Sequence, residues 1–487
     1  MPTPSDTDAR SALADLTLQQ TASAIRGGTL GATQAVQSTL ASIAALDPLL
    51  NAFCTLADDA LRNAQDIDAR LARGASPGPL AGVPVAIKDL VCTRGLRTTF
   101  GSRLYADFVP QEDDVVVERL RAAGAIVIGK TNTSEFGYGA IGHNPLFPTT
   151  RNPWNTELTP GGSSAGSAAA IAARMLTLAI GSDGGGSVRV PAALCGVFGI
   201  KPSWGRVPVY PGCRDERYPG ASSWESLEHI GPITRNAADA ALALSVLCGP
   251  TPRDRFSIPD DDRSWDIADP DTLRGARVAL SVDLGFATVD HDIRRATEQA
   301  AQRIAQTYGC AVEQAHPGIA DPGEMFETLV ALDTDRAGLR RMAAEQGVTP
   351  TGWLARLLAR DWSGDAFTQA VFDRKRVVNA VWRFMEKHDF LLTPTTASCA
   401  FAIDIEGPTH INGQPVSSVA WLPFSSIANL TGLPAASVPI GCTPQGLPVS
   451  LQIMGRHLDD RGVLALSQAV EALYPMQERR PAVCAAH

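Results

Sequence analysis

Residues 161–190 read GGSSAGSAAAIAARMLTLAIGSDGGGSVRV, and this stretch decides how the chain is expected to fold. Alanine predominates from Ser164 to Arg174, which predicts a helix that opens directly after a glycine-serine segment. Leu176 to Ile180 then reads as a buried strand, followed by a second glycine-serine segment at 181–187. Both segments are therefore expected at the ends of regular elements, where functional loops commonly lie.

The two segments place serine hydroxyls among glycines, whose lack of a side chain lets backbone amides approach a reacting atom. This combination predicts the active centre of a serine hydrolase. A serine nucleophile needs a base, and residues 83–89, VPVAIKD, set Lys88 at the end of an apolar, strand-like run. Only five of the 42 basic side chains are lysines. Because arginine cannot give up its proton in a protein, Lys88 is the candidate base.

Strand-like and helix-like segments alternate through the first half of the chain, as in a sheet covered by helices. Asp113 is expected to cap a helix that ends at Gly124, and residues 125–128, AIVI, read as the next buried strand. Thr234 is expected to cap another helix, which stops near Gly249.

The second half continues the same pattern less clearly. Residues 260–271 read as an acidic surface linker, and helices are expected across 292–308 and 336–360. The sheet is expected to resume at 390–394, 435–440 and 448–453. No linker, charge block or repeat divides the chain, so we expect one large domain.

Composition limits the possible functions. The 487 residues carry a formal net charge of −9, which disfavours a nucleic-acid or anionic-membrane surface because both need clustered Lys and Arg.

The longest apolar run, 168–180, is interrupted by Arg174 and is too short to span a bilayer, which takes roughly 20 residues. No secretory signal, C-x-x-C pair or H-E-x-x-H motif occurs, so we expect a cytoplasmic protein without a metal, whose cysteines are mostly buried free thiols.

Further motifs occur in a fixed order along most of the chain. They are LAGVP at 80–84, GKTN at 129–132, the two serine segments, GIKPSWGR at 199–206, IGP at 230–232, GLP at 446–448 and LQ at 451–452. This ordered set resembles the amidase signature family, the Ser-Ser-Lys hydrolases that include stand-alone amidases and the amidotransferase subunits acting on misacylated transfer RNA.

The resemblance implies an α/β fold with a central, mixed, twisted sheet covered by helices on both faces. It also implies an N-terminal helical region, 1–70, and a catalytic domain, 71–487. The core of that domain is expected at 80–250 and 385–470, and a variable helical covering region at about 255–385.

The resemblance further makes Ser187 the nucleophile, Ser163 the bridging serine and Lys88 the base at the end of the proton relay. A hydroxyl is a poor nucleophile until its proton is removed, and an intervening hydroxyl can pass that proton to a neutral amine. Family members hold the bridging serine in a cis peptide, which here is Gly162–Ser163.

The resemblance assigns the oxyanion hole to the backbone amides of Gly184, Gly185, Gly186 and Ser187. Supporting positions match Ser164, Asp183 and Arg189, although Asp183 and Arg189 also fit a purely structural buried pair. The chain departs from the commoner family pattern at Gly184, where many members have a side chain, and at Ala165, where many have glycine. Neither departure removes a reacting group.

Tyr138, Ile141 and Tyr210, with the aperiodic segment 204–224, suggest a partly apolar substrate pocket. We therefore expect a hydrolase of aryl or alkyl amides, with carbamates (urethanes) and esters as further substrates. The resemblance implies no cofactor. The expected partner is the small-molecule substrate, with no nucleic acid or membrane, and the expected state is a monomer or homodimer.

Two other functions compete with this one. The first is a glutamine-dependent amidotransferase A-type subunit, which would need partner subunits. The second is an α/β-hydrolase-type esterase, because residues 162–166 also fit G-x-S-x-G with Ser164 as nucleophile. That motif requires an acid and then a histidine downstream, for which Asp389 and His410 are candidates outside any recognisable motif. A G-x-G-x-x-G match at 137–142 is discarded because prolines follow where a helix should open.

Overall fold

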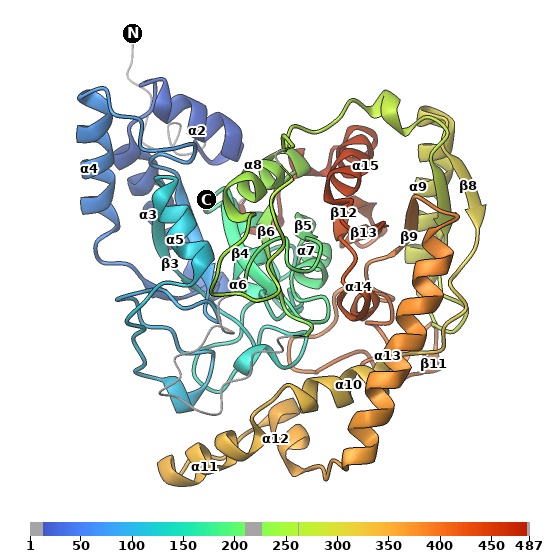
Figure 1. Ribbon diagram of the computed structural model, residues 1–487. Coiled ribbons are helices and arrows are strands. Elements are labelled where there is room, and N and C mark those ends of the chain that lie inside the picture. The colour runs from blue at the N-terminus through green and yellow to red at the C-terminus, as the bar shows by residue number, and fades with distance from the viewer. Residues whose placement is uncertain (1–12, 210–225, 262, 485–487) are drawn as a thin grey trace.

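The computed structural model describes residues 13–209, 226–261 and 263–484, and most of its strands form one twisted sheet through the molecule (Figure 1). The strands of this sheet are β1 (Phe53–Leu56), β2 (Pro84–Lys88), β3 (Ile126–Thr131), β4 (Leu178–Asp183), β5 (Phe198–Lys201), β6 (His229–Thr234), β7 (Arg277–Leu280), β8 (Ala311–Gln314), β9 (Phe390–Pro394), β12 (Ala435–Cys442) and β13 (Pro448–Gly455). A separate two-stranded ribbon pairs β10 (His410–Ile411) with β11 (Gln414–Pro415).

Within the described residues, the strand order is β1-β3-β2-β4-β6-β5-β12-β13-β9-β7-β8. Strands β3, β2 and β4 run parallel to one another, as do β9, β7 and β8, and the remaining neighbours are antiparallel. Strands from both halves of the chain meet where β5 pairs with β12. The predicted mixed sheet in a single large domain is confirmed.

Helices pack on both faces of the sheet (Figure 1). They are α2 (Leu18–Arg26), α3 (Ala32–Leu50), α4 (Ala60–Ala72), α5 (Val115–Ala122), α6 (Ala165–Ala172), α7 (Arg189–Cys195), α8 (Ala237–Leu247), α9 (His291–Tyr308), α10 (Gly323–Leu332), α11 (Arg336–Gln346), α12 (Gly352–Ala359), α13 (Gly364–Met385), α14 (Ser426–Thr431) and α15 (Asp460–Leu473).

Strand β2 shows how the two faces are separated. Val85 and Ile87 join the core cluster that contains α5, α8, α9 and α15, whereas Ala86 joins the cluster of α3, α4, α6 and α7. Successive side chains of a strand point to opposite faces, so this alternation buries both sides of the sheet. Lys88, at the carboxyl end of the same strand, is fully buried in turn.

Helix α6 lies against neighbouring backbone because its residues are small. All eight of its residues, AGSAAAIA, are buried. A Cβ on Gly166 would collide with the Ala52 carbonyl and lie 2.5 Å from the Asn132 backbone nitrogen. The small side chains therefore let α6 approach the sheet edge closely and fix the loop that precedes it.

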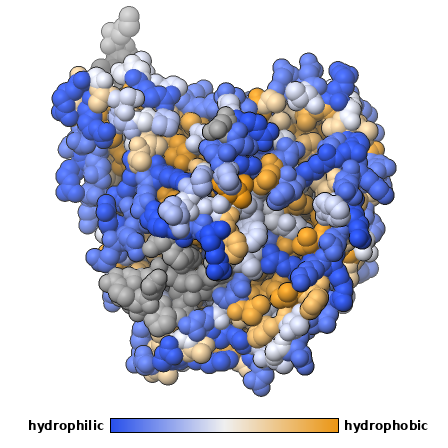
Figure 2. Space-filling model, viewed as in Figure 1, coloured by the Kyte–Doolittle hydropathy of each residue, from blue (hydrophilic) through white to orange (hydrophobic). Residues whose placement is uncertain are grey.

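Helices α10 to α13 form a covering layer along the lower side of the molecule as drawn in Figure 1. They share a hydrophobic cluster with aromatic residues of the first half, including Phe100, Tyr105, Phe136 and Tyr138. The predicted helix at 336–360 is wrong as a single element. It ends at Gln346, because Gly347 has a positive φ of 64°, and α12 restarts at Gly352. Viewed from the same side, the surface is mostly hydrophilic and is interrupted by apolar patches (Figure 2).

Two predicted helix caps are each wrong by one or two residues. Asp114, not Asp113, caps α5 by accepting the Val116 N–H, while Asp113 accepts the Arg94 N–H and pairs with Arg121. Asn236, not Thr234, caps α8, because Thr234 still belongs to β6. The predicted strand at 176–180 begins at Leu178 and continues to Asp183. Each difference moves an element boundary and leaves the element in place.

Asp114 makes the stability of the fold depend on pH. Burial raises its pKa to about 7, and its Oδ2 has no hydrogen-bond partner. The folded state therefore holds a proton that the unfolded state releases, so the Asp114 contribution to stability is present below about pH 4 and is lost as pH rises towards 7. In Asp114→Asn, the melting temperature should rise relative to wild type between pH 4 and pH 8, as measured by calorimetry. A difference that does not change with pH would contradict this. Asp113→Asn, which removes an ion-paired carboxylate, is the control and should be less stable than wild type at pH 8.

No helix among residues 13–209, 226–261 and 263–484 combines the length and apolar character needed to cross a bilayer.

Candidate active site

Lys88 projects from the end of β2 into a fully buried polar cluster. Its Nζ lies 2.7 Å from Ser163 Oγ, 3.0 Å from Ser182 Oγ and 3.2 Å from the Ser182 carbonyl oxygen. Strands β2 and β4 are parallel neighbours, so their carboxyl ends lie at the same edge of the sheet. This topology brings Lys88 to Ser182 and to the loop that carries Ser163.

The loop before α6 has an unusual backbone. The Gly162–Ser163 peptide bond is cis, as the resemblance implies. A Cβ on Gly162 would collide with the backbone of Ile141, so only glycine fits there. The Ser164 N–H donates to the Ser187 carbonyl at 3.1 Å and joins the two serine loops.

Ser164 and Ser187 differ in their surroundings. Ser164 is fully buried, and its hydroxyl donates to the Ser182 carbonyl at 3.2 Å. Ser187, in contrast, lines an open cavity. The acid and histidine considered for a Ser164 nucleophile have other partners. Asp389 pairs with Arg277 and Arg456, and His410 contacts Thr409. The geometry therefore does not support a triad around Ser164.

The loop at 184–187 connects β4 to α7 and is held by Asp183. The Gly186 N–H donates to Asp183 Oδ1 at 2.7 Å, and the Val188 N–H donates to Oδ2 at 3.1 Å. Gly186 has a φ of 124°, which favours glycine. The prediction that Gly186 supplies an oxyanion donor is therefore corrected: its amide is already engaged by the Asp183 carboxylate.

Asp183 and Arg189 form a fully buried ion pair with two contacts. Arg189 Nη2 lies 2.8 Å from Asp183 Oδ1, and Arg189 Nε lies 3.0 Å from Oδ2. Burial raises the pKa of Asp183, but the charge and hydrogen bonds of Arg189, together with the hydrogen bond from Asn429, outweigh burial and hold that pKa below its usual value. The carboxylate is therefore charged and fixed when it binds the loop amides.

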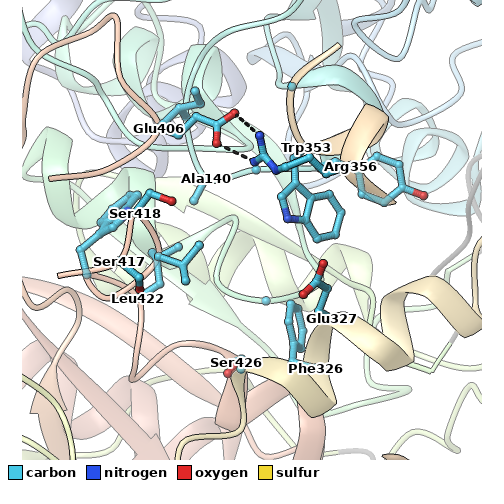
Figure 3. A pocket seen from close by; sticks show the side chains of 18 of the residues that line it. Ala140, Phe326, Glu327, Trp353, Arg356, Glu406, Ser417, Ser418, Leu422 and Ser426 are labelled. Atoms are coloured by element: carbon cyan, nitrogen blue, oxygen red, sulfur yellow. Dashed lines mark hydrogen bonds and ion pairs between the residues drawn. The ribbon is translucent and has the colours of Figure 1, made fainter. Parts of the chain in front are cut away.

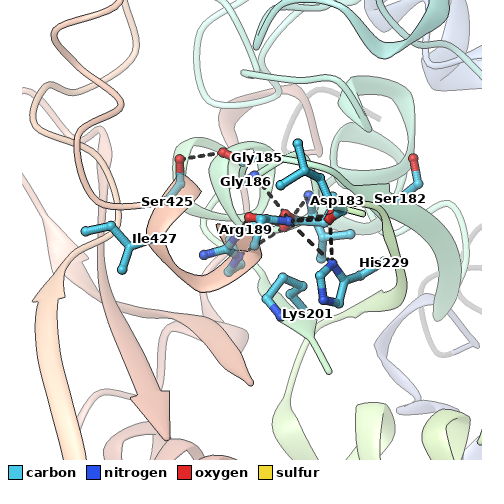
Figure 4. Close-up of polar contacts among 12 residues, drawn as sticks. Ser182, Asp183, Gly185, Gly186, Arg189, Lys201, His229, Ser425 and Ile427 are labelled. Carbon is cyan, nitrogen blue, oxygen red and sulfur yellow. Dashed lines mark hydrogen bonds and ion pairs between the residues drawn. The ribbon is translucent and has the colours of Figure 1, made fainter. Parts of the chain in front are cut away.

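Residues from the second half of the chain complete this network. Asn429 accepts from Arg189 and donates to the Asp183 main-chain carbonyl at 2.6 Å, while Gln452 accepts from Arg189 Nη1 at 2.7 Å. Ser425 Oγ donates to the Gly185 carbonyl at 2.6 Å, as Figure 4 shows. None of these residues, nor Ser182, was assigned a role from the sequence. The available signals were the LQ motif for Gln452 and the position of Ser182 directly before Asp183.

Lys201 and His229 lie beside this network (Figure 4). Burial, reinforced by the nearby Arg189 charge, holds the pKa of Lys201 well below its usual value. Burial, together with the charge of Lys201, also holds the pKa of His229 well below its usual value.

A cavity of about 610 Å³ opens in front of Gly185 and Ser187. Its walls come from residues 135–145, α10, α12 and residues 417–426 (Figure 3). Tyr138 and Ile141 line the cavity, whereas Tyr210 lies outside the described residues. The covering layer adds Phe326 and Trp353, which were not predicted because no motif marks them in the sequence.

Within the described parts of the chain, no group of three or more His, Cys, Asp or Glu side chains is arranged to hold a metal ion.

Comparison with known proteins adds to this geometry. The family model described as Amidase matches residues 34–464. The A subunit of glutamyl-tRNA(Gln) amidotransferase from Carboxydothermus hydrogenoformans is 35% identical, over 94% of this chain and 97% of that protein. The crystal structure of a bacterial aryl acylamidase of the amidase signature family aligns with a TM-score of 0.85 at 28% identity, covering 96% of this chain and 99% of that one. The A subunit of the Thermotoga maritima glutamyl-tRNA(Gln) amidotransferase aligns with a TM-score of 0.75 at 29% identity, covering 95% and 96% of the two chains.

Proposed function

Because the chain belongs to the amidase signature family, whose enzymes act on carbon–nitrogen bonds, we propose that it hydrolyses carboxylic amides through an acyl-enzyme on Ser187. The observation that carries the proposal is the buried contact of 2.7 Å between Lys88 Nζ and Ser163 Oγ, next to the loop that carries Ser187. A base and a bridging hydroxyl are thus in contact, and a second hydroxyl faces the cavity.

In the acylation half of the proposed cycle, Ser187 Oγ attacks the substrate carbonyl carbon. Its proton passes to Ser163 Oγ, whose own proton passes to Lys88 Nζ. Burial removes the water that stabilises an ammonium group, which favours the neutral amine that a base requires. The tetrahedral intermediate then collapses, and the leaving amine takes a proton back through Ser163. Water repeats the sequence on the acyl-enzyme and releases the acid.

The negative oxygen of the tetrahedral intermediate requires donors that are in place before the reaction. We assign this role to the amides of Gly184, Gly185 and Ser187, since the Gly186 N–H binds Asp183. The Asp183–Arg189 pair, Asn429 and Ser425 act as positioning residues that hold the loop in one conformation.

Ser425 tests this assignment of the loop. Its hydroxyl donates to the Gly185 carbonyl, so in Ser425→Ala the peptide group between Gly185 and Gly186 is held only by the Gly186 N–H contact with Asp183. We expect kcat to fall by about tenfold, the effect of losing one well-placed contact worth roughly 1.4 kcal/mol, with KM within twofold of wild type. Ser425→Thr, which keeps the hydroxyl, should recover most of the activity. Equal losses in Ser425→Ala and Ser425→Thr, or a change confined to KM, would argue against a positioning role.

The cavity supports aryl or alkyl amides as the preferred substrates, with carbamates and esters as chemically related ones. Its volume of about 610 Å³ and its lining by Phe326, Trp353 and Leu422 suit an apolar group larger than a small primary amide. We therefore propose a stand-alone amidase. The experiment is a panel of chromogenic anilides, carbamates, esters and primary amides, in which kcat/KM should be highest for the anilides.

A second candidate is the A-type component of a glutamine-dependent amidotransferase, and the curated relatives favour it. The relative from Carboxydothermus hydrogenoformans carries that name at 35% identity across nearly the full length. The comparison of tertiary structures favours the stand-alone amidase instead, since the TM-score is 0.85 for the aryl acylamidase and 0.75 for the amidotransferase component. Purified alone, the protein should release little ammonia from glutamine while it cleaves anilides. Efficient glutaminase activity with a copurifying partner, and no anilide cleavage, would establish the second candidate.

A further inference from the structure

The cavity in front of Ser187 is lined by more carboxyl groups than guanidinium groups. Its described lining contains five carboxyl groups and two guanidinium groups, namely Glu135, Asp321, Glu324, Glu327 and Glu406 with Arg356 and Arg360. Arg356 is paired with Glu406 at 2.6 Å. Arg360 is shared between Glu324 at 3.2 Å and Glu327 at 3.4 Å. Because one guanidinium cannot neutralise two carboxylates, this wall retains negative charge.

Glu327 is better placed than Glu324 to act on a molecule in the cavity. The Glu327 side chain is 34% exposed, whereas that of Glu324 is 83% exposed. Figure 3 shows the Glu327 carboxylate directed towards Trp353, with the Phe326 ring on its other side. The face of an aromatic ring attracts a cation, and a carboxylate beside apolar groups is screened less than one in open water.

Phe326 connects this wall to the reacting centre. Its Cζ lies 2.5 Å from the position that a Cβ on Gly185 would occupy, so the ring packs directly on the loop at 184–187. Glu327 follows Phe326 in α10 and lines the same cavity as Ser187. A molecule that fills this cavity can therefore contact Glu327 and Trp353 as well as Ser187.

We propose that Glu327, with the rings of Trp353 and Phe326, selects amide substrates that carry a protonated amine. Glu327 accepts hydrogen bonds from the ammonium group, and Trp353 presents a ring face to it. This selection rests on the proposed amidase function and narrows its substrate class to cationic amides.

The test compares two series of anilides that differ only in charge. One series carries an ω-aminoacyl group with two to six methylenes, and the other carries the alkanoyl group of the same length. For the best length, wild type should prefer the cationic anilide by about tenfold in kcat/KM, the size expected for one charge-assisted contact. In Glu327→Gln the ratio should fall to within twofold of one, mainly through a higher KM for the cationic series.

Glu298→Gln is the control for net charge, because Glu298 is exposed on α9 and does not line the cavity. It should keep the tenfold ratio. If wild type cleaves both series equally, or if Glu327→Gln keeps the preference, the selection is wrong while the amidase function stands.

Binding separates this inference from the proposed reaction. Calorimetry with Ser187→Ala should show that the cationic anilide of the best length binds about tenfold tighter than its neutral counterpart. The additional change Glu327→Gln should remove the difference. If wild type cleaves neither series but this binding pattern holds, the reaction is wrong and the selection stands. Equal binding of the two anilides, or a preference for an anionic analogue, would overturn the selection.

Discussion

Ser187→Ala is expected to lower kcat/KM for a cleaved anilide by about 10⁴-fold or more, with unchanged thermal stability. Loss of the nucleophile removes the acyl-enzyme route, and losses of this order follow removal of a serine nucleophile in other hydrolases. The effect should appear in kcat, since the cavity that binds substrate is otherwise intact. Steady-state kinetics with a chromogenic anilide, beside calorimetric unfolding, measure both quantities.

Ser164→Ala is the matched control for this prediction. Both serines lie in glycine-rich loops, but the Ser164 hydroxyl is buried and donates to the Ser182 carbonyl. Its removal should cost about one to two orders of magnitude, because it supports the loop and does not react. An inactive Ser164→Ala enzyme together with an active Ser187→Ala enzyme would reverse the assignment and restore the alternative nucleophile.

Lys88→Met is expected to lose about 10³-fold in kcat/KM at neutral pH, within the range that a general base contributes. Methionine fills most of the lysine volume, so the buried site should stay packed. Hydroxide can partly replace the missing base, so the loss should shrink steadily towards alkaline pH. The measurement is the ratio of wild-type to variant kcat/KM across the pH range in which both proteins remain folded.

Lys130→Met is the matched control, because it shows what the loss of a buried structural lysine does to activity. Lys130 is also fully buried, and it donates to the Val91 carbonyl and to Thr93 Oγ1 at 3.1 Å. Its replacement should lower stability without a pH-dependent loss of activity. If the Lys88 variant loses the same factor at every pH, as expected for damage to packing, the proton relay through Ser163 is excluded.

The sequence predicted the parts of this structure that follow from local patterns. Apolar runs such as 390–394 have the same bounds in the structure, because a buried strand bounded by proline leaves little freedom. The cis bond before Ser163 came from a family resemblance. Cap positions were less well determined, because Asp113 and Asp114 are adjacent and both can accept backbone N–H groups.

Contacts across the sheet could not be predicted in the same way. Asn429 contacts Arg189 and Ser425 contacts Gly185 because β5 pairs with β12, which brings α14 beside α7. The positions of Phe326 and Glu327 depend on how the covering helices pack, and their sequence carries no motif. The family resemblance did not predict that the Gly186 N–H donates to Asp183, because this hydrogen bond depends on the orientation of one peptide group.

The role of Ser187 is tested most directly by mapping the covalent adduct left by a serine-directed fluorophosphonate. We expect one added phosphonyl group in the intact mass of wild type, located by peptide mapping on Ser187 and absent from Ser187→Ala. We also expect much slower labelling in Lys88→Met at neutral pH. An adduct on Ser164, or none at all in a protein that cleaves amides, would contradict the claim that Lys88 and Ser163 activate Ser187.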